Sequence, residues 1–384
     1  MASPAYLLLL TVGTIVTGCL NSLFTKYQDN QCVRNCNNPD LSTHKTFEQP
    51  VLQTLQMFIG ELSVFLVYWV FYKSPYARNK RSSLSIETAE PELSLVQSFK
   101  LAIPSICDLC GTTLVNIGLL YTPVSIYQMT RGSIVLFVAI FSVIFLKRRI
   151  TKLEWISLIL VTLGVIIVGL SGSNSSSTES DLSNETASLV IFGMFLIVLA
   201  EICQAAQFVI EEYILSQQSI LPLQLVYYEG FYGATVLMTV FIFMHVVVGT
   251  ISNPSDFQAS PFNLIESFSE MFSNRVVLLS SVCIMISIAS FNFFGISLTH
   301  ELSATARSTV DTCRTLLVWI LAIAMGWESF LFLQFLGFVV LVFGSLCFNG
   351  VLQPETWAFV PQCLKSGEES HPLLNDTEDP LERI

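Results

Sequence analysis

The chain has 384 residues, of which 52% are hydrophobic and only 12% are charged, and its formal net charge is −11. Soluble globular domains carry about 25% charged residues, so this composition excludes a soluble domain and predicts an integral membrane protein in a lipid bilayer. Nothing in the sequence suggests nucleic-acid binding, so we expect no nucleic-acid partner.

Apolar runs of about 20 residues, the length that crosses the hydrocarbon core of a bilayer, recur along the whole sequence. The part of the first run that ends at Cys19 also resembles the apolar region of a cleaved signal peptide, but no basic residues precede it as such signals require, and the whole run is long. We predict ten membrane-spanning helices, near residues 4–25, 51–72, 99–120, 124–146, 153–171, 187–214, 223–247, 276–298, 302–325 and 328–350.

The basic residues outside these runs indicate the orientation of the chain. If the amino terminus is cytosolic, eleven Lys and Arg residues fall on the cytosolic side and four on the lumenal side. This asymmetry obeys the positive-inside rule. We therefore expect both termini in the cytosol.

Three features fall on the predicted lumenal side. Asn174 and Asn184 begin N-x-S/T sequons and are expected to be glycosylated. An oxidising lumen would permit a disulfide between Cys32 and Cys36, and two free thiols are the alternative. Residues 263–274 carry apolar side chains at helical spacing, as in a helix that lies on the membrane surface.

An internal repeat organises the chain. The segment 118–122 (GLLYT) is echoed by 295–299 (GISLT), an offset of 177 residues. Each half then contains five spans, and an odd number inverts the second half relative to the first. The predicted organisation is a first five-span repeat at 1–171, a Ser-rich lumenal loop at 172–186, a second, inverted repeat at 187–350 and a disordered cytosolic tail at 351–384.

Three arginines, Arg131, Arg307 and Arg314, lie inside apolar runs. An arginine at mid-bilayer depth costs roughly 2.5–3.5 kcal/mol on insertion scales, so such residues usually face a partner or a water-filled cavity. Arg307, Asp311 and Arg314 stand at i, i+4 and i+7 and therefore share one helix face. Other polar residues within the runs are Glu61, Asp108, Asn116, Gln128, Glu201, Glu211, Glu229 and Asn292.

These polar stripes have two interpretations. In the first, they line a water-filled interior through which a solute crosses the membrane. In the second, they are polar contacts between helices, each of which contributes about 0.6 kcal/mol to stability on average. We expect Arg131 to face a cavity and Arg307 to be structural, with Arg307 or Arg314 paired with Asp311. The adjacent acids Glu211 and Glu212 are expected to form a solvated helix end or a gate.

Enzyme and metal signatures are missing from the sequence. Cys107 and Cys110 form a C-x-x-C pair, but neither a second pair nor a histidine cluster accompanies it, so packing is the preferred interpretation. We find no nucleophile with a base and no phosphate-binding glycine loop. We expect no metal, no cofactor and no enzymatic activity.

The order of several segments across the chain resembles the drug/metabolite transporter superfamily, and within it solute carrier family 35, subfamily F, which is nucleotide-sugar-transporter-like. These segments are 58–61 (FIGE), 128–132 (QMTRG), 211–212 (EE), 229–233 (EGFYG), 291–296 (FNFFGI), 301–307 (ELSATAR) and 326–328 (GWE). The resemblance implies an all-α polytopic fold of ten transmembrane helices, arranged as two inverted five-helix repeats, that works by alternating access without ATP.

The expected function is transport of a small organic solute, with an anionic or zwitterionic substrate favoured, either nucleotide-sugar-like or amino-acid- or peptide-like. Arg131 would hold a negative group, because a guanidinium suits phosphate and carboxylate. The remaining expected pocket residues are Asp108, Asn116, Gln128, Asn292 and Arg314. The expected sites for a coupling proton are Glu61, Glu201 and Asp311. The alternative is a membrane scaffold or signalling partner that no longer transports anything.

The carboxyl-terminal tail contains a match to a sorting motif. Glu369, Leu373 and Leu374 match the acidic dileucine form, and a clathrin adaptor is the partner that such a motif recruits. The resemblance also implies a lysosomal or late-endosomal membrane. The Golgi or another endomembrane is the alternative.

Overall fold

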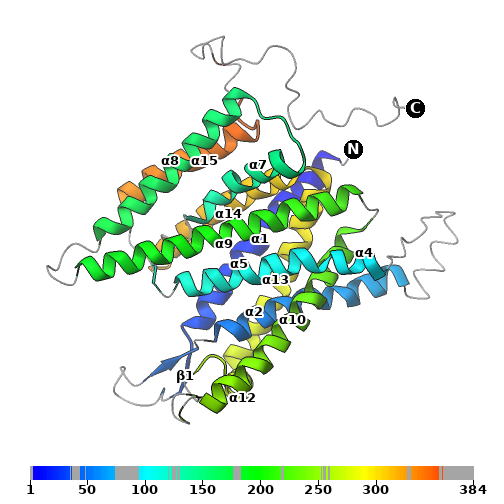
Figure 1. Ribbon diagram of the computed structural model, residues 1–384, viewed down its shortest axis with the longest axis vertical. Helices are drawn as coiled ribbons and strands as arrows, with labels where there is room; N and C mark the ends of the chain where they lie inside the picture. The colour runs from blue at the N-terminus through cyan, green and yellow to red at the C-terminus, as the bar shows by residue number, and fades with distance from the viewer. Residues whose placement is uncertain are drawn as a thin grey trace. The chain divides into compact units, whose positions relative to one another are not determined.

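The computed structural model is almost entirely helical (Figure 1). It describes residues 3–34, 36, 44–47, 49–73, 95–119, 121–122, 127, 130–175, 183–217, 220–251, 253, 257, 260–326, 330–353 and 357. The helices are α1 (Pro4–Asp29), α2 (Pro50–Tyr68), α4 (Leu95–Lys100), α5 (Ala102–Leu119), α7 (Ile134–Phe145), α8 (Lys152–Ser175), α9 (Ser183–Gln217), α10 (Pro222–Ile251), α12 (Leu264–Ser273), α13 (Arg275–Glu301), α14 (Ala304–Ala324) and α15 (Phe332–Phe348). A π-helical segment, η2 (Trp69–Lys73), continues α2, and a 3₁₀ turn, η3 (Arg131–Ser133), precedes α7.

Each of the ten predicted spans contains a helix, because long apolar runs satisfy their backbone hydrogen bonds internally only as helices in lipid. Among the described residues, six helices are long and apolar enough to cross a membrane by length and composition. They are α1, α2 with η2, residues 98–119, the part of α9 from residue 188, α10 and α13. The all-α polytopic membrane class is therefore confirmed.

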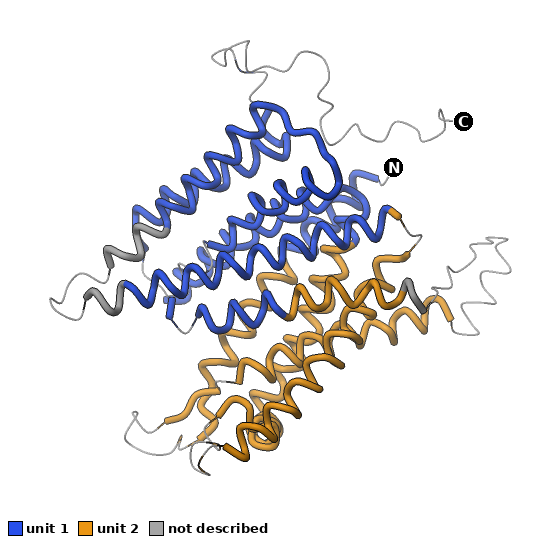
Figure 2. Tube along the Cα trace, in the orientation of Figure 1, with its two compact units in different colours: residues 1–15, 110–216, 297–384 blue, residues 16–109, 217–296 orange. Residues whose placement is uncertain are grey.

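Two compact units make up the chain (Figure 2). The first unit comprises residues 1–15, 110–216 and 297–384, and the second comprises residues 16–109 and 217–296. Each unit takes elements from both predicted sequence halves. A predicted sequence half is thus not a compact unit in space.

In the first unit, α8 and α15 lie side by side (Figure 1). Glycine permits this close approach, since a Cβ added to Gly164 would lie 2.7 Å from the backbone nitrogen of Leu341. A second buried cluster surrounds α7, where Ile134 and Val138 pack with Val209 of α9 and Phe348 of α15. This packing positions the start of α7 beside α9 and α14.

In the second unit, α2 packs against α10. Gly230 of α10 meets the backbone of α2, where an added Cβ would lie 2.3 Å from the nitrogen of Leu62. Phe58, Leu52 and Phe241 are fully buried in the adjoining core. The helix that carries Glu61 is therefore fixed by contact between main chains.

The sequence did not indicate the short hairpin between α1 and α2. Strand β1 (Cys32–Arg34) pairs antiparallel with β2 (Lys45–Thr46). The hairpin carries the Cys32–Cys36 disulfide, so the structure shows the bonded alternative and not two free thiols. Asn263 caps the amino end of α12 by accepting a hydrogen bond from the Glu266 amide.

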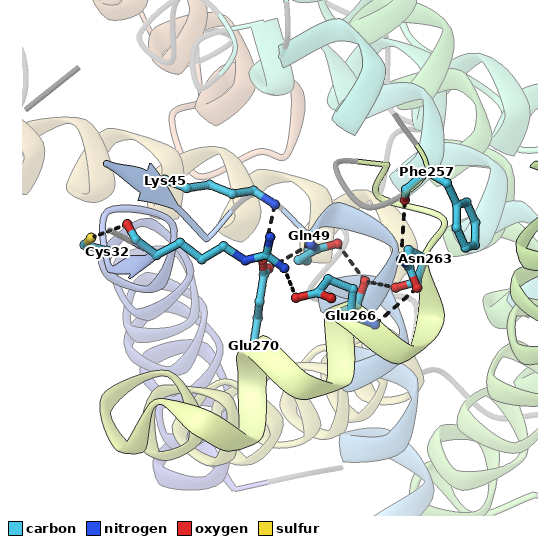
Figure 3. A network of polar contacts seen from close by, with 9 residues as sticks. Cys32, Lys45, Gln49, Phe257, Asn263, Glu266 and Glu270 are labelled. Carbon is cyan, nitrogen blue, oxygen red and sulfur yellow. Dashed lines mark hydrogen bonds and ion pairs between the residues drawn. The ribbon is translucent and has the colours of Figure 1, made fainter. Parts of the chain in front are cut away.

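Polar contacts join this hairpin to α12 (Figure 3). Glu270, whose side chain is 3% exposed, accepts hydrogen bonds from Lys45 Nζ at 3.2 Å and Gln49 Nε2 at 2.9 Å. Arg34 Nε lies 3.2 Å from the same carboxylate, and Arg34 also pairs with Glu266. The apolar Ile265 of α12 is 70% exposed. The helix thus turns both Glu270 and the apolar Met271 to the protein, whereas Ile265 and Phe272 are exposed on its outer side.

Replacing Glu270 with Gln is expected to lower the free energy of unfolding by about 1–3 kcal/mol, the cost of losing a charged hydrogen-bond partner at a buried site. Denaturant unfolding of the purified protein in detergent measures this change. Glu266→Gln is the matched control, since this carboxylate is 24% exposed and forms one described ion pair. Equal losses in the two variants would contradict a central role for Glu270.

Candidate functional site

Arg131 begins η3 at the entry to α7, and its guanidinium is shared by several groups of the first unit. Nη1 donates to the Tyr127 hydroxyl at 2.9 Å. Nη2 lies 3.8 Å from Asp311 Oδ2, and Nε lies 3.9 Å from Glu201 Oε1. Both carboxylates are therefore at ion-pair distance and beyond hydrogen-bond distance. The side chain is 17% exposed.

Glu201 lies in the middle of α9 and is completely buried. Neither of its carboxylate oxygens accepts a hydrogen bond from a residue that the structure describes. Ordinarily a buried carboxylate is hydrogen-bonded, because desolvation otherwise strongly disfavours its charge. Glu201 is thus an exception to this rule, which makes it a candidate functional residue.

Asp311 and Arg314 form a tight pair one turn apart on α14. Arg314 Nε donates to Asp311 Oδ1 at 2.6 Å, and both side chains are 3% exposed. Together with Arg131 and Glu201 they form what we call the charge cluster. It contains two positive and two negative groups when all four are ionised.

Arg307, four residues before Asp311, belongs to a separate contact. It pairs with Glu211 of α9, and its guanidinium lies 3.9 Å from the centroid of the Phe208 ring. Glu212 accepts a hydrogen bond from the Ala304 amide at 2.8 Å, at the start of α14. The expected solvated helix end is therefore wrong for Glu211, which is 0% exposed because Arg307 satisfies its charge inside the protein.

The second unit contains another buried polar contact. Asn292 Nδ2 of α13 donates to Glu61 Oε1 of α2 at 2.5 Å, and Glu61 is 1% exposed. Ser105 Oγ donates to the Glu229 backbone carbonyl at 3.0 Å. Glu61 and Asn292 were predicted for different roles, and the structure brings them together.

The remaining predicted site residues are partly buried, lie at helix ends or fall outside the described residues. Asp108 and Asn116 are partly buried on α5. Asn174 lies in the last turn of α8 and Asn184 in the first turn of α9, so the helices extend into both ends of the predicted 172–186 loop. Four predicted residues lie outside the described residues: Gln128, Glu369, Leu373 and Leu374.

Sequence reasoning missed two residues of this region. Tyr127 stands four positions before Arg131, a helical spacing that could have indicated the contact. Phe208 gave no signal, because one phenylalanine in an apolar run resembles any other. Among the described residues, no group of three or more His, Cys, Asp or Glu side chains could hold a metal ion.

Comparison with known proteins identifies the family. The nucleotide-sugar transporter family model matches residues 43–246, more than half of the chain. Solute carrier family 35 member F6 of Mus musculus is 33% identical over 99% of both chains. The chain belongs to the nucleotide-sugar transporter family, in solute carrier family 35, subfamily F. Members of this family are solute carriers and not enzymes, so the chain is a multi-pass endomembrane solute transporter.

Two further comparisons cover most of the chain. An uncharacterized protein of Schizosaccharomyces pombe is 39% identical over 90% of this chain and 98% of its own length. A solved crystal structure aligns over 90% of this chain and 96% of that chain, with a TM-score of 0.52 and 12% identity. The second comparison shows a shared fold alone. The fold of that solved structure is therefore shared by most of this chain.

Proposed function

We propose that the chain is a secondary-active carrier of a small anionic or zwitterionic organic solute, nucleotide-sugar-like or amino-acid- or peptide-like, in a lysosomal or late-endosomal membrane. It would work by alternating access with ten spans in two inverted repeats. Arg131 would hold the negative group of the solute. Asp108, Asn116, Gln128, Asn292 and Arg314 remain the further candidates for contact with the solute.

The state of Arg131 carries this proposal. Arg307 and Arg314 are 2–3% exposed and each lies at hydrogen-bond distance from a carboxylate. Arg131 is 17% exposed, and its two carboxylate neighbours are 3.8 and 3.9 Å away. A guanidinium held this loosely keeps donors for a bidentate contact with phosphate or carboxylate. It is therefore the anion-binding group that the geometry favours.

A thermal-shift screen of the purified protein against nucleotides, nucleotide sugars, amino acids and organic cations identifies the solute class. A binder at a hundredfold excess over its dissociation constant stabilises the folded state by about 2.7 kcal/mol. Uptake of the hits into proteoliposomes then tests transport. If no compound in the panel stabilised the protein, a non-transporting scaffold would be favoured.

Arg131→Gln is expected to reduce uptake of an anionic hit by at least tenfold, because the buried anion loses its charged partner, a contact worth about 1.5–3 kcal/mol. Arg131→Lys, which keeps the charge and loses the planar fork, should retain part of the uptake. Arg275→Gln is the matched control, since this arginine is exposed at the start of α13. Undiminished uptake by Arg131→Gln would remove Arg131 from the site.

A further inference from the structure

The charge cluster is balanced, and this balance constrains what can bind to it. Arg131 and Arg314 offset Glu201 and Asp311, and the four side chains are between 1% and 17% exposed. An anion that binds at Arg131 adds a negative charge where little water can screen it. Charge in such surroundings must be compensated or neutralised. One of the two carboxylates, Glu201 or Asp311, is therefore expected to lose its negative charge by binding a proton.

The two carboxylates are not equivalent in this respect. Asp311 accepts a hydrogen bond from Arg314 at 2.6 Å, and this contact does not involve Arg131. Glu201 accepts no hydrogen bond from the described residues, and its one described ion pair is with Arg131 at 3.9 Å. When Arg131 turns to a bound anion, Asp311 keeps its cation and Glu201 loses its nearest one. Glu201 is the group left with an uncompensated charge.

We propose that Glu201 binds one proton when an anionic group binds at Arg131, so that the solute and the proton cross the membrane together. This inference rests on the proposed carrier function. The proton comes from water on the side where the solute binds, and it converts the Glu201 carboxylate to a neutral carboxylic acid. On the other side the solute leaves, Arg131 returns to Glu201, and the proton is released to water. Arg131 keeps its charge throughout the cycle.

The surroundings of Glu201 agree with this assignment. The charged groups that face it are Arg131 at the start of α7 and Asp311 and Arg314 on α14. The other acidic groups of this part of α9, Glu211 and Glu212, contact Arg307 and the Ala304 amide. They are engaged at the start of α14 and do not compete for Arg131.

Infrared difference spectroscopy of the purified protein tests the assignment without a solute. As the pH is lowered, the carbonyl stretch of a protonated carboxylic acid is expected from Glu201 before Asp311. Glu201→Gln should abolish this first band and Asp311→Asn should leave it. Arg131→Gln should produce the same band at a higher pH, and Arg131→Gln combined with Glu201→Gln should not. Loss of the first band in Asp311→Asn, or its persistence in Glu201→Gln, would overturn the proposal.

A transport assay separates this inference from the proposed function. Proteoliposomes that contain a pH-sensitive dye are given uridine monophosphate or glutamate, one phosphate and one carboxylate. During uptake by the wild type, the interior of the proteoliposomes is expected to become more acidic. The Glu201→Gln variant is expected to move the solute without this acidification. Uptake by the wild type without acidification would overturn proton coupling and leave the carrier function intact. If neither probe is taken up, the choice of solute fails, and the infrared result still decides the role of Glu201.

Discussion

Replacing Arg307 with Met is expected to lower the free energy of unfolding by about 3–5 kcal/mol, the cost of breaking a buried ion pair by removing one partner. The variant keeps much of the side-chain volume but leaves the buried Glu211 without its guanidinium, and it also removes the cation over the Phe208 ring. Loss of folded protein on heating, or unfolding in denaturant, measures the change in purified protein.

Two further variants make this prediction specific. Arg307→Met combined with Glu211→Leu should recover most of the loss, because replacing a whole buried pair by apolar groups is often neutral or stabilising. Arg275→Met, at an exposed arginine, should change the free energy of unfolding by less than about 0.5 kcal/mol. A loss below about 1 kcal/mol in the single Arg307 variant would contradict a structural role for the pair.

Replacing Gly230 with Ala is expected to lower the free energy of unfolding by about 1–3 kcal/mol through overpacking. The added methyl group would lie 2.3 Å from the Leu62 nitrogen and 2.7 Å from Glu61 Cβ, so α2 has to move away from α10. Alanine also favours the helix by about 1 kcal/mol over glycine, which makes a net loss a clear sign of crowding. Denaturant unfolding of the purified variant measures the loss.

Gly249 of the same helix provides the matched control. The nearest atom to a Cβ added there is Phe257 Cζ at 3.2 Å, and this position is exposed. Gly249→Ala should therefore be neutral or stabilise the protein by up to about 1 kcal/mol. A similar loss at both positions would show that crowding between α2 and α10 is not the cause.

Helix positions could be predicted from the sequence because apolar runs and their polar interruptions are local signals. The predicted surface helix at 263–274 is α12 (Leu264–Ser273), with Asn263 and Asn274 as its flanking residues. The hairpin β1–β2 could not be predicted in the same way. Its strands have three and two residues, too few for an alternating pattern to be recognised.

The partners within the candidate site were predictable only in part. Asp311 and Arg314 are three residues apart on one helix, so their pairing follows from helix geometry. The partner of Arg307 could not be found, because contact between α14 and Glu211 of α9 depends on the height and rotation of two helices. Sequence spacing reports neither quantity. The adjacent Glu211 and Glu212 therefore resembled an ordinary solvated end.

These two neighbouring acids have a mechanical consequence. Successive residues of an α-helix point about 100° apart, and here one acid contacts the Arg307 side chain while the other contacts the Ala304 main chain. Any twist or slide of α9 against the start of α14 would break at least one of these contacts. Helices α9 and α14 should therefore move together as a rigid pair. The distance between Glu201 and Asp311 should then stay constant through a transport cycle. The moving partner in the charge cluster is then Arg131 at the start of α7.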